Sequence, residues 1–219
     1  MPDLIAEDPS TKDLTRTDEL LANAPWKRFA VLGDSHAAGV REAFAGYPDR
    51  SWSEWLVEGL SRSQPELAAQ NFGKIGLLTR EVRAQQLAPA LAFEPDLAVV
   101  LCGGNDLLRG SYDGVADELA QMVAALQEHG CVVVTMGLFD MTRSDLLPDE
   151  LKPPLKEQLD ELYEIVEGVA GRYGTVHLDF GKHPASADRS IYASDYQHLT
   201  TRGHAVVAAE LIRRLSELS

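Results

Sequence analysis

The chain has 219 residues, of which 45% are hydrophobic, so it is long enough for one α/β domain with a complete core. Its 34 acidic residues outnumber 20 basic ones and give a net charge of −14, which excludes nucleic acids and anionic membrane surfaces as partners because most of the surface would repel them. The sequence has neither an apolar leader behind a basic start nor an apolar run of about 18 residues, so we expect a cytoplasmic protein without membrane insertion.

The predicted elements begin with a polar, acidic arm over residues 1–27, with a short helix over 17–22, ahead of a main domain over 28–219. A role of the arm as a lid or an oligomer contact is left open. Apolar runs of strand length then occur at residues 28–33, 67–72, 96–103, 131–137 and 175–180. Helical spacing is found between and after them, at residues 37–44, 51–60, 79–93, 113–129, 155–173 and 200–219.

This alternation of strands and helices predicts a parallel sheet that is covered by helices on both faces. Ser51 and Thr200 are the expected N-caps of their helices, because each precedes a stretch with apolar residues at helical spacing. Two irregular connections, 138–154 and 181–194, are long for a compact domain. We therefore expect them to contact the substrate, with Met141, Thr142, Arg143 and Tyr192 among their residues.

Ser35 stands where the first predicted strand ends and a predicted helix begins. In an α/β sheet this is where ligands bind, and the backbone N–H groups and dipole of a helix start favour negative charge. A serine at this place is compatible with a helix N-cap or with a nucleophile. Near the other end of the chain, Asp195 and His198 supply a carboxylate and an imidazole three residues apart, which are the two further parts of a serine nucleophile's machinery.

Four short motifs, taken together, resemble the four blocks of the SGNH (GDSL-like) hydrolase family. In chain order they are Gly33-Asp34-Ser35, Asn71-x-Gly73-x-x-Gly76, Gly103-Gly104-Asn105-Asp106 and Asp195-x-x-His198. The resemblance implies an α/β fold, namely a three-layer α/β/α sandwich with a five-stranded parallel sheet in flavodoxin-like order. It also implies a catalytic triad of Ser35, Asp195 and His198.

The same resemblance implies an oxyanion hole formed by the backbone N–H of Ser35, the backbone N–H of Gly76 and the side-chain amide of Asn105. Gly73 competes with Gly76 for this role. We favour Gly76 because the second-block glycine of the family lies five residues after the asparagine, here Asn71. Asn71 and Gly73 are then expected to shape the loop.

Several other polar residues are expected to support the site without taking part in the reaction. Asp34 and Asp106 are interpreted as hydrogen-bonding partners of the motif residues, and His204 as a buried hydrogen-bonding histidine. His36 stands where the family motif has leucine, so a role in lining the pocket and one as an alternative base are both left open.

No cofactor and no metal site is expected, because the six histidines do not cluster with other ligands at metal-binding spacing. Cys102 and Cys131 lie in apolar runs and are interpreted as reduced, structural residues.

The function predicted from these observations is that of a serine hydrolase that cleaves carboxylic esters through an acyl-serine intermediate. The expected partner is a small-molecule ester, either a small acyl ester or an acetylated sugar. An acyltransferase or a thioesterase with the same Ser-His-Asp site is the alternative, and an inactive binding protein of the same fold is a remote one. The oligomeric state is left open.

Overall fold

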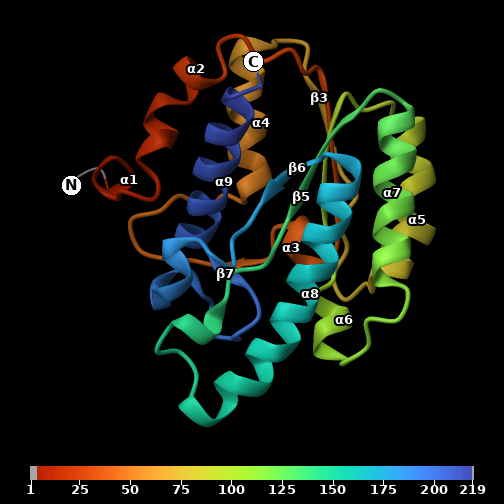
Figure 1. Cartoon of the computed structure of the whole chain (residues 1–219). Helices are drawn as coiled ribbons and strands as arrows, with labels where there is room; N and C mark the ends of the chain where they lie inside the picture. The colour runs from red at the N-terminus through yellow and green to blue at the C-terminus, as the bar shows by residue number, and fades with distance from the viewer. Residues whose placement is uncertain (1–3, 219) are drawn as a thin grey trace.

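A five-stranded parallel sheet lies between two layers of helices in the computed structural model, which describes residues 4–218 (Figure 1). The strands of this sheet are β1 (Arg28–Gly33), β3 (Ala68–Asn71), β4 (Leu97–Leu101), β5 (Val132–Met136) and β6 (Val176–Leu178). Their spatial order is β3-β1-β4-β5-β6, and all neighbouring strands are parallel. This is the flavodoxin-like order, so the predicted fold class is confirmed.

Helices cover both faces of the sheet because its strands are apolar on both sides. One face packs on α4 (Trp52–Ser63) and α9 (Thr201–Ser216), and the other packs on α5 (Thr79–Ala92), α7 (Val115–Glu128) and α8 (Lys152–Tyr173) (Figure 1). Within β1, Val31 belongs to the core under α4 and α9, whereas its neighbour Leu32 belongs to the opposite core. This alternation is the period-2 pattern of a strand that is buried on both faces.

Two predicted helix starts are confirmed by their caps. The Ser51 hydroxyl accepts a hydrogen bond from the Glu54 N–H, and the Glu54 carboxylate accepts one from the Ser51 N–H, which together form a capping box. The Thr200 hydroxyl accepts a hydrogen bond from the Gly203 N–H at the start of α9. The last helix therefore begins directly after the block that contains His198.

The helix predicted over residues 37–44 is wrong in position and length. α3 spans only Ser35–Ala38 and ends at Gly39, which has φ 81° in the left-handed region that glycine adopts without strain. The chain then forms β2 (Arg41–Glu42), which pairs in parallel with β7 (Leu199–Thr200). This two-stranded sheet joins the segment after Ser35 to the segment after His198.

The described part of the N-terminal arm packs on the outside of α4 and α9. It contains α1 (Leu4–Glu7), the 3₁₀ helix η1 (Lys12–Arg16) and α2 (Thr17–Leu20), so the helix predicted over 17–22 ends earlier than expected. Leu14 and Leu21 of the arm are buried in the core of that face. Arg202 of α9 donates a hydrogen bond to the Asp8 carboxylate over 2.8 Å, which ties the arm to α9.

Several other boundaries differ from the prediction by a few residues. α8 begins at Lys152 rather than at residue 155, because Pro153 and Pro154 fall in its first turn, where a missing N–H costs nothing. The strand predicted over 175–180 is limited to Val176–Leu178. A short helix, α6 (Gly104–Leu108), was not predicted.

The two long connections contain short 3₁₀ helices. These are η2 (Met141–Arg143), η3 (Asp149–Leu151), η4 (Pro184–Ala187) and η5 (Arg189–Ile191). Across residues 4–218, every helix is too short or too polar to pass through a bilayer.

Candidate active site

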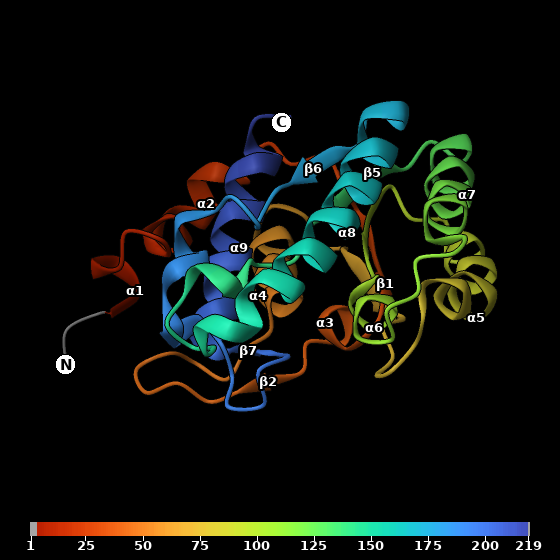
Figure 2. The same cartoon turned by 60° about the horizontal axis from the view of Figure 1, so that its bottom comes forward.

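The residues that the sequence motifs single out gather at the carboxyl ends of β1 and β4. These two neighbouring strands lie where the strand order reverses, because β1 is followed by β3 on one side and β4 stands on the other. Ligands of open α/β sheets bind at such a point. Figure 2 brings this end of the molecule forward, with α3 and α6 following the two strands and β2 and β7 beside them.

The turn that carries Ser35 depends on a glycine and a buried glutamine. A Cβ atom on Gly33 would lie 1.8 Å from the carbonyl oxygen of Leu101, so only glycine fits between β1 and β4 here. The side chain of Gln86, in α5, accepts a hydrogen bond from the Gly33 N–H at 2.8 Å and donates one to the Gly33 carbonyl at 2.9 Å. The Gln86 side chain therefore fixes both the N–H and the carbonyl of the residue that precedes Asp34 and Ser35.

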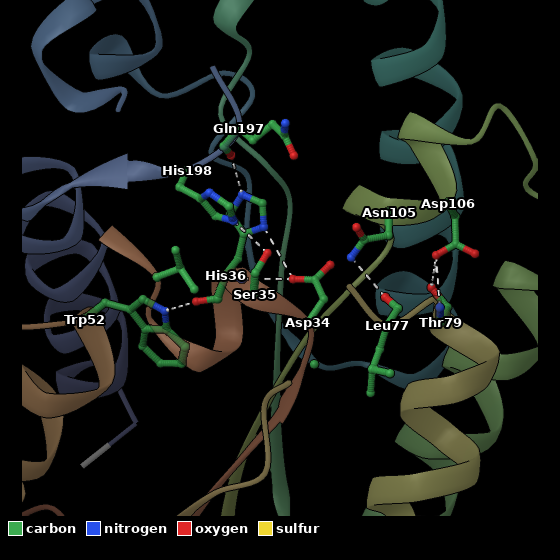
Figure 3. A network of polar contacts seen from close by, with 12 residues as sticks. Asp34, Ser35, His36, Trp52, Leu77, Thr79, Asn105, Asp106, Gln197 and His198 are labelled. Carbon is green, nitrogen blue, oxygen red and sulfur yellow. Dashed lines mark hydrogen bonds and ion pairs between the residues drawn. The ribbon is translucent and has the colours of Figure 1, made fainter. Parts of the chain in front are cut away.

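Ser35, His198 and Asp195 form a continuous chain of hydrogen bonds. Nε2 of His198 is 2.9 Å from Oγ of Ser35, and Nδ1 of His198 is 2.6 Å from Oδ2 of Asp195 (Figure 3 shows the Ser35–His198 contact). The two partners of His198 come from distant parts of the sequence. Asp195 lies three residues before His198, whereas Ser35 lies 163 residues before it. This geometry allows His198 to take a proton from Ser35 while Asp195 fixes the tautomer of the imidazole.

Asp195 is held as a carboxylate by its own loop. Burial alone would raise its pKa, but the hydrogen bond with the His198 side chain and those from the backbone N–H groups of His198 and Gln197 outweigh that effect and lower the pKa to about 2. Asp195 is therefore ionised throughout the neutral range and can orient the imidazole and stabilise a positive charge on it.

Of the three residues predicted to form an oxyanion hole, Ser35 and Asn105 line the cavity described below, and Gly76 lies in the loop between β3 and α5. The backbone N–H groups of Ser35 and Gly76 find no acceptor within the part of the chain that the structure describes. Asn105, in α6, donates one amide hydrogen to the Leu77 carbonyl at 3.0 Å, which leaves its second amide hydrogen available (Figure 3). Unpaired donors at one sheet edge are what a developing negative charge requires.

The loop between β3 and α5 distinguishes Gly73 from Gly76. The Gly73 N–H donates to the side chain of Asn71 at 2.8 Å, and a Cβ atom on Gly73 would lie 2.5 Å from the backbone nitrogen of Ala38. Gly73 is thus used for close packing against α3. Gly76 has φ 81° and open space around it, and it lies between Lys74, which is bonded to Gly33, and Leu77, which is bonded to Asn105.

His36 makes a second carboxylate–imidazole pair beside Ser35. Its Nδ1 is 3.3 Å from Oδ1 of Asp34, and its Nε2 is 2.9 Å from the carbonyl oxygen of Gln197 (Figure 3). Its ring centroid lies 5.6 Å from that of His198. His36 also lines the cavity described below, which agrees with the hypothesis that it lines the pocket. Its two ring nitrogens contact Asp34 and Gln197, whereas Nε2 of His198 contacts Ser35.

Trp52 supports the site, although the sequence analysis did not assign it there. Its indole N–H donates to the His36 carbonyl at 3.0 Å. The backbone N–H of Trp52 donates to Nδ1 of His204, and Nε2 of His204 faces the Val40 carbonyl at 3.1 Å. The expectation of a buried, hydrogen-bonded His204 is confirmed, and burial lowers its pKa to about 4.

An apolar cavity of about 120 Å³ opens beside Ser35 and His198. Most of its wall consists of large apolar side chains, among them Leu107, Met136, Phe139, Leu155, Leu159 and Phe180. Leu108 and Tyr196 line it as well and are 59% and 51% exposed, so apolar surface continues to the mouth. The cavity is suited to the apolar part of a ligand whose reactive group lies at Ser35.

The two long connections contribute less to this cavity than expected. Met141 and Tyr192 line it, as predicted, but Thr142 and Arg143 do not. Arg143 instead donates to the carbonyls of Gly181 and His183 and so joins the two connections to each other. The helix α8 supplies lining residues that the sequence analysis did not assign to the site.

Asp106 and the two cysteines have structural positions. The Asp106 carboxylate accepts hydrogen bonds from the N–H and the hydroxyl of Thr79, which links α6 to the start of α5 (Figure 3). Cys102 and Cys131 are free and buried, and burial raises the pKa of the Cys131 thiol to about 12. Between residues 4 and 218, His, Cys, Asp and Glu side chains form no group of three that would hold a metal ion.

The chain matches one protein-family model and is similar in fold to several solved structures. A family model described as the GDSL-like lipase/acylhydrolase family matches residues 31–206, which include all four sequence motifs. No curated protein matches the chain significantly.

The similar solved structures share low sequence identity with this chain. A catalytic mutant of Axe2, an acetylxylan esterase from Geobacillus stearothermophilus, has a TM-score of 0.70 at 18% identity, covering 86% of this chain and 94% of that one; its histidine is replaced by alanine. Two further catalytic mutants of the same esterase replace a serine and an aspartate, and the replaced aspartate lies three positions before the histidine. TesA has a TM-score of 0.66 at 20% identity, covering 88% of this chain and 99% of that one.

Proposed function

The chain belongs to the GDSL-like lipase/acylhydrolase family and is a carboxylic ester hydrolase, and from this premise we propose that Ser35 is its nucleophile, His198 its general base and Asp195 the residue that orients His198. The observation that carries the proposal is the hydrogen-bonded chain of 2.6 and 2.9 Å from Asp195 through His198 to Ser35, at the mouth of an apolar cavity. The aspartate-to-histidine spacing in the Geobacillus esterase supports it.

The reaction proceeds in two proton-balanced halves. Oγ of Ser35 attacks the ester carbonyl carbon while Nε2 of His198 takes the hydroxyl proton, which produces a tetrahedral oxyanion. His198 returns the proton to the leaving alcohol oxygen as the C–O bond breaks, and an acyl-serine remains. A water molecule then attacks the acyl carbon and gives a proton to His198, and this proton returns to Ser35 when the carboxylic acid leaves.

The oxyanion is stabilised by the N–H of Ser35, the N–H of Gly76 and the side-chain amide of Asn105. The free N–H of Gly76 and its place between two anchored loop residues support its assignment over Gly73, whose N–H is already bonded. Donors that are in place before the reaction do not need to reorganise as charge develops. Each contributes on the order of 100-fold to 1,000-fold to the rate.

The acyl group of the substrate is apolar and longer than acetyl. The Geobacillus neighbour is an acetylxylan esterase, so an acetylated sugar is the competing substrate class. An acetyl group would leave the cavity wall formed by Leu155, Leu159 and Phe180 without a partner. Each methylene that enters such a wall from water gains about 0.8 kcal/mol, or roughly a fourfold preference.

This function is tested with p-nitrophenyl esters of graded acyl length beside acetylated xylo-oligosaccharides. We expect kcat/KM to rise roughly fourfold per methylene from acetate until the cavity is full. Ser35→Ala should abolish turnover and labelling by a fluorophosphonate, with the label on Ser35 in the unaltered protein by mass spectrometry. A preference for acetate or for the acetylated sugar contradicts the substrate class, and turnover by Ser35→Ala contradicts the assignment of the nucleophile.

A further inference from the structure

Both ring nitrogens of His36 face groups that only accept hydrogen bonds. Nδ1 faces Oδ1 of Asp34 at 3.3 Å, and Nε2 faces the carbonyl oxygen of Gln197 at 2.9 Å. A neutral imidazole carries one N–H, so in either tautomer one of these contacts would set two acceptors against each other. The imidazolium carries an N–H on both nitrogens and satisfies both contacts at once.

The contact with Gln197 holds the peptide group that precedes His198. Its carbonyl oxygen is bonded by His36, and its N–H, which belongs to His198, donates to Oδ1 of Asp195 at 2.9 Å. The other hydrogen bonds that the described structure gives residues 195–197 stay within residues 193–198. The His36 contact is therefore the one that fastens this exposed part of the loop to α3.

The charges around His36 favour its cation. Asp34 is buried, and its second oxygen, Oδ2, has no hydrogen-bond partner among residues 4–218, so the carboxylate needs a neighbouring positive charge. Asp195, in the C-terminal loop, also attracts a positive charge on His36. The other titratable histidines near His36 are His198 and His204. Burial would lower the pKa of His36, but Asp34, the Gln197 carbonyl and Asp195 together raise it.

We propose that His36 is a positioning residue that, as an imidazolium, ties the turn of the nucleophile Ser35 to the loop of the base His198. The proposal rests on the proposed function, because it assumes the roles given there to Ser35 and His198. His36 stays outside the proton transfers. It fixes the peptide plane from which the His198 side chain extends, and it balances the charge of Asp34 next to the reacting serine.

The ionisation of His36 is tested by NMR of the protein with ¹³C-labelled histidine, with the His36 signal assigned by its loss in His36→Gln. We expect the His36 ring to titrate above the ordinary histidine value of about 6.5 and to be mostly protonated at that pH. A ring that is neutral at pH 6 overturns the assignment of the imidazolium. This readout does not depend on any activity of the protein.

The positioning role is tested by kinetics on the best p-nitrophenyl ester. His36→Leu should lower kcat by about 10-fold to 100-fold with a smaller change in KM, because a shift of the base by about 1 Å is that costly. His36→Gln keeps a donor for the Gln197 carbonyl and should therefore recover part of the loss in kcat. In the unaltered protein we expect kcat to decline at alkaline pH as His36 loses its proton, and His36→Gln should lack this decline.

His129→Leu is the matched control, because His129 is an exposed histidine at the far end of α7, and it should leave kcat unchanged. Circular dichroism checks that each variant is folded, and His36→Gln provides the measurement should His36→Leu fail to fold. A kcat of His36→Leu equal to that of the control overturns the positioning role. Activity that survives Ser35→Ala contradicts the proposed function instead, so the two failures are distinct.

Discussion

Asn105 is the proposed oxyanion donor whose contribution a side-chain substitution can remove directly. Asn105→Ala should lower kcat/KM by about 100-fold to 1,000-fold on p-nitrophenyl esters, because the transition state then loses one prearranged donor. The loss should fall mainly on kcat, since the ground-state carbonyl carries little of the charge.

Arg109→Ala is the control for this measurement, because Arg109 lies at the exposed end of the same short helix, α6. Its kcat/KM should stay close to that of the unaltered protein. Asn105 also donates to the Leu77 carbonyl, so thermal unfolding of both variants is compared. A loss in Asn105→Ala below tenfold, in a protein of unchanged melting temperature, would show that the other donors suffice.

The sequence was sufficient to predict the residues that meet at the site but not those that hold them there. Ser35, Asp195 and His198 stand in motifs whose residue types carry their own chemical meaning. Gln86 lies within a helix, and nothing in the sequence around it indicates that its side chain hydrogen-bonds the backbone of Gly33, 53 residues away. Such a contact exists only once α5 is packed beside β1, so no local pattern can reveal it.

At the scale of elements, we expect α8 to limit the length of the acyl group. Leu155 is half-buried near the start of α8 and lines the cavity, so a tryptophan there has room to be accommodated while it fills part of the space. Leu155→Trp should leave kcat/KM for the acetate ester nearly unchanged and lower it at least tenfold for the longest ester that the unaltered protein prefers, because about two methylenes lose their place.

Leu151→Trp is the matched control, because Leu151 directly precedes α8, is 55% exposed and does not line the cavity. Its chain-length profile should equal that of the unaltered protein. If Leu155→Trp lowers activity on all esters by the same factor, the cavity is not the acyl site.

Element boundaries show where local preference yields to packing. Residues 37–44 suit a helix by composition, yet α3 stops at Ala38 because Gly39 adopts the left-handed conformation. Glycine is required there, since a Cβ atom would lie 2.6 Å from the Cβ of Ser51. The pairing of β2 with β7 then competes with further helix, and it places the Ser35 and His198 segments side by side. Sequence periodicity contains no information about a partner more than 150 residues away.

For the whole molecule, the periodic pattern was sufficient to predict a parallel sheet with helices on both faces, whereas the strand order came from the family resemblance. Five predicted strands can be ordered in several ways that periodicity does not distinguish. The order found here places β1 beside β4, and so it brings Ser35 and Asn105 to one edge. The site is thus a consequence of topology, and each motif alone is only a set of residue types.

The whole molecule should become less stable in mild acid because of His204. Its Nδ1 accepts the Trp52 N–H, so the buried ring is neutral when folded, and burial lowers its pKa to about 4. An unfolded histidine takes up a proton near pH 6.5, so this stabilisation is complete above pH 6.5 and is lost progressively as the pH falls toward 4. The loss in the free energy of unfolding approaches about 3 kcal/mol.

Urea unfolding at pH 7.5 and pH 5 measures this effect through a variant that cannot titrate. His204→Gln should be less stable than the unaltered protein at pH 7.5, because it fits the sites of Trp52 and Val40 less well, but its stability should fall less between the two pH values. His129→Gln removes an exposed histidine and should keep the pH dependence of the unaltered protein. Other groups titrate equally in all three proteins, so the difference between them isolates His204. An equal fall in His204→Gln and the unaltered protein would mean that the acid sensitivity arises elsewhere in the fold.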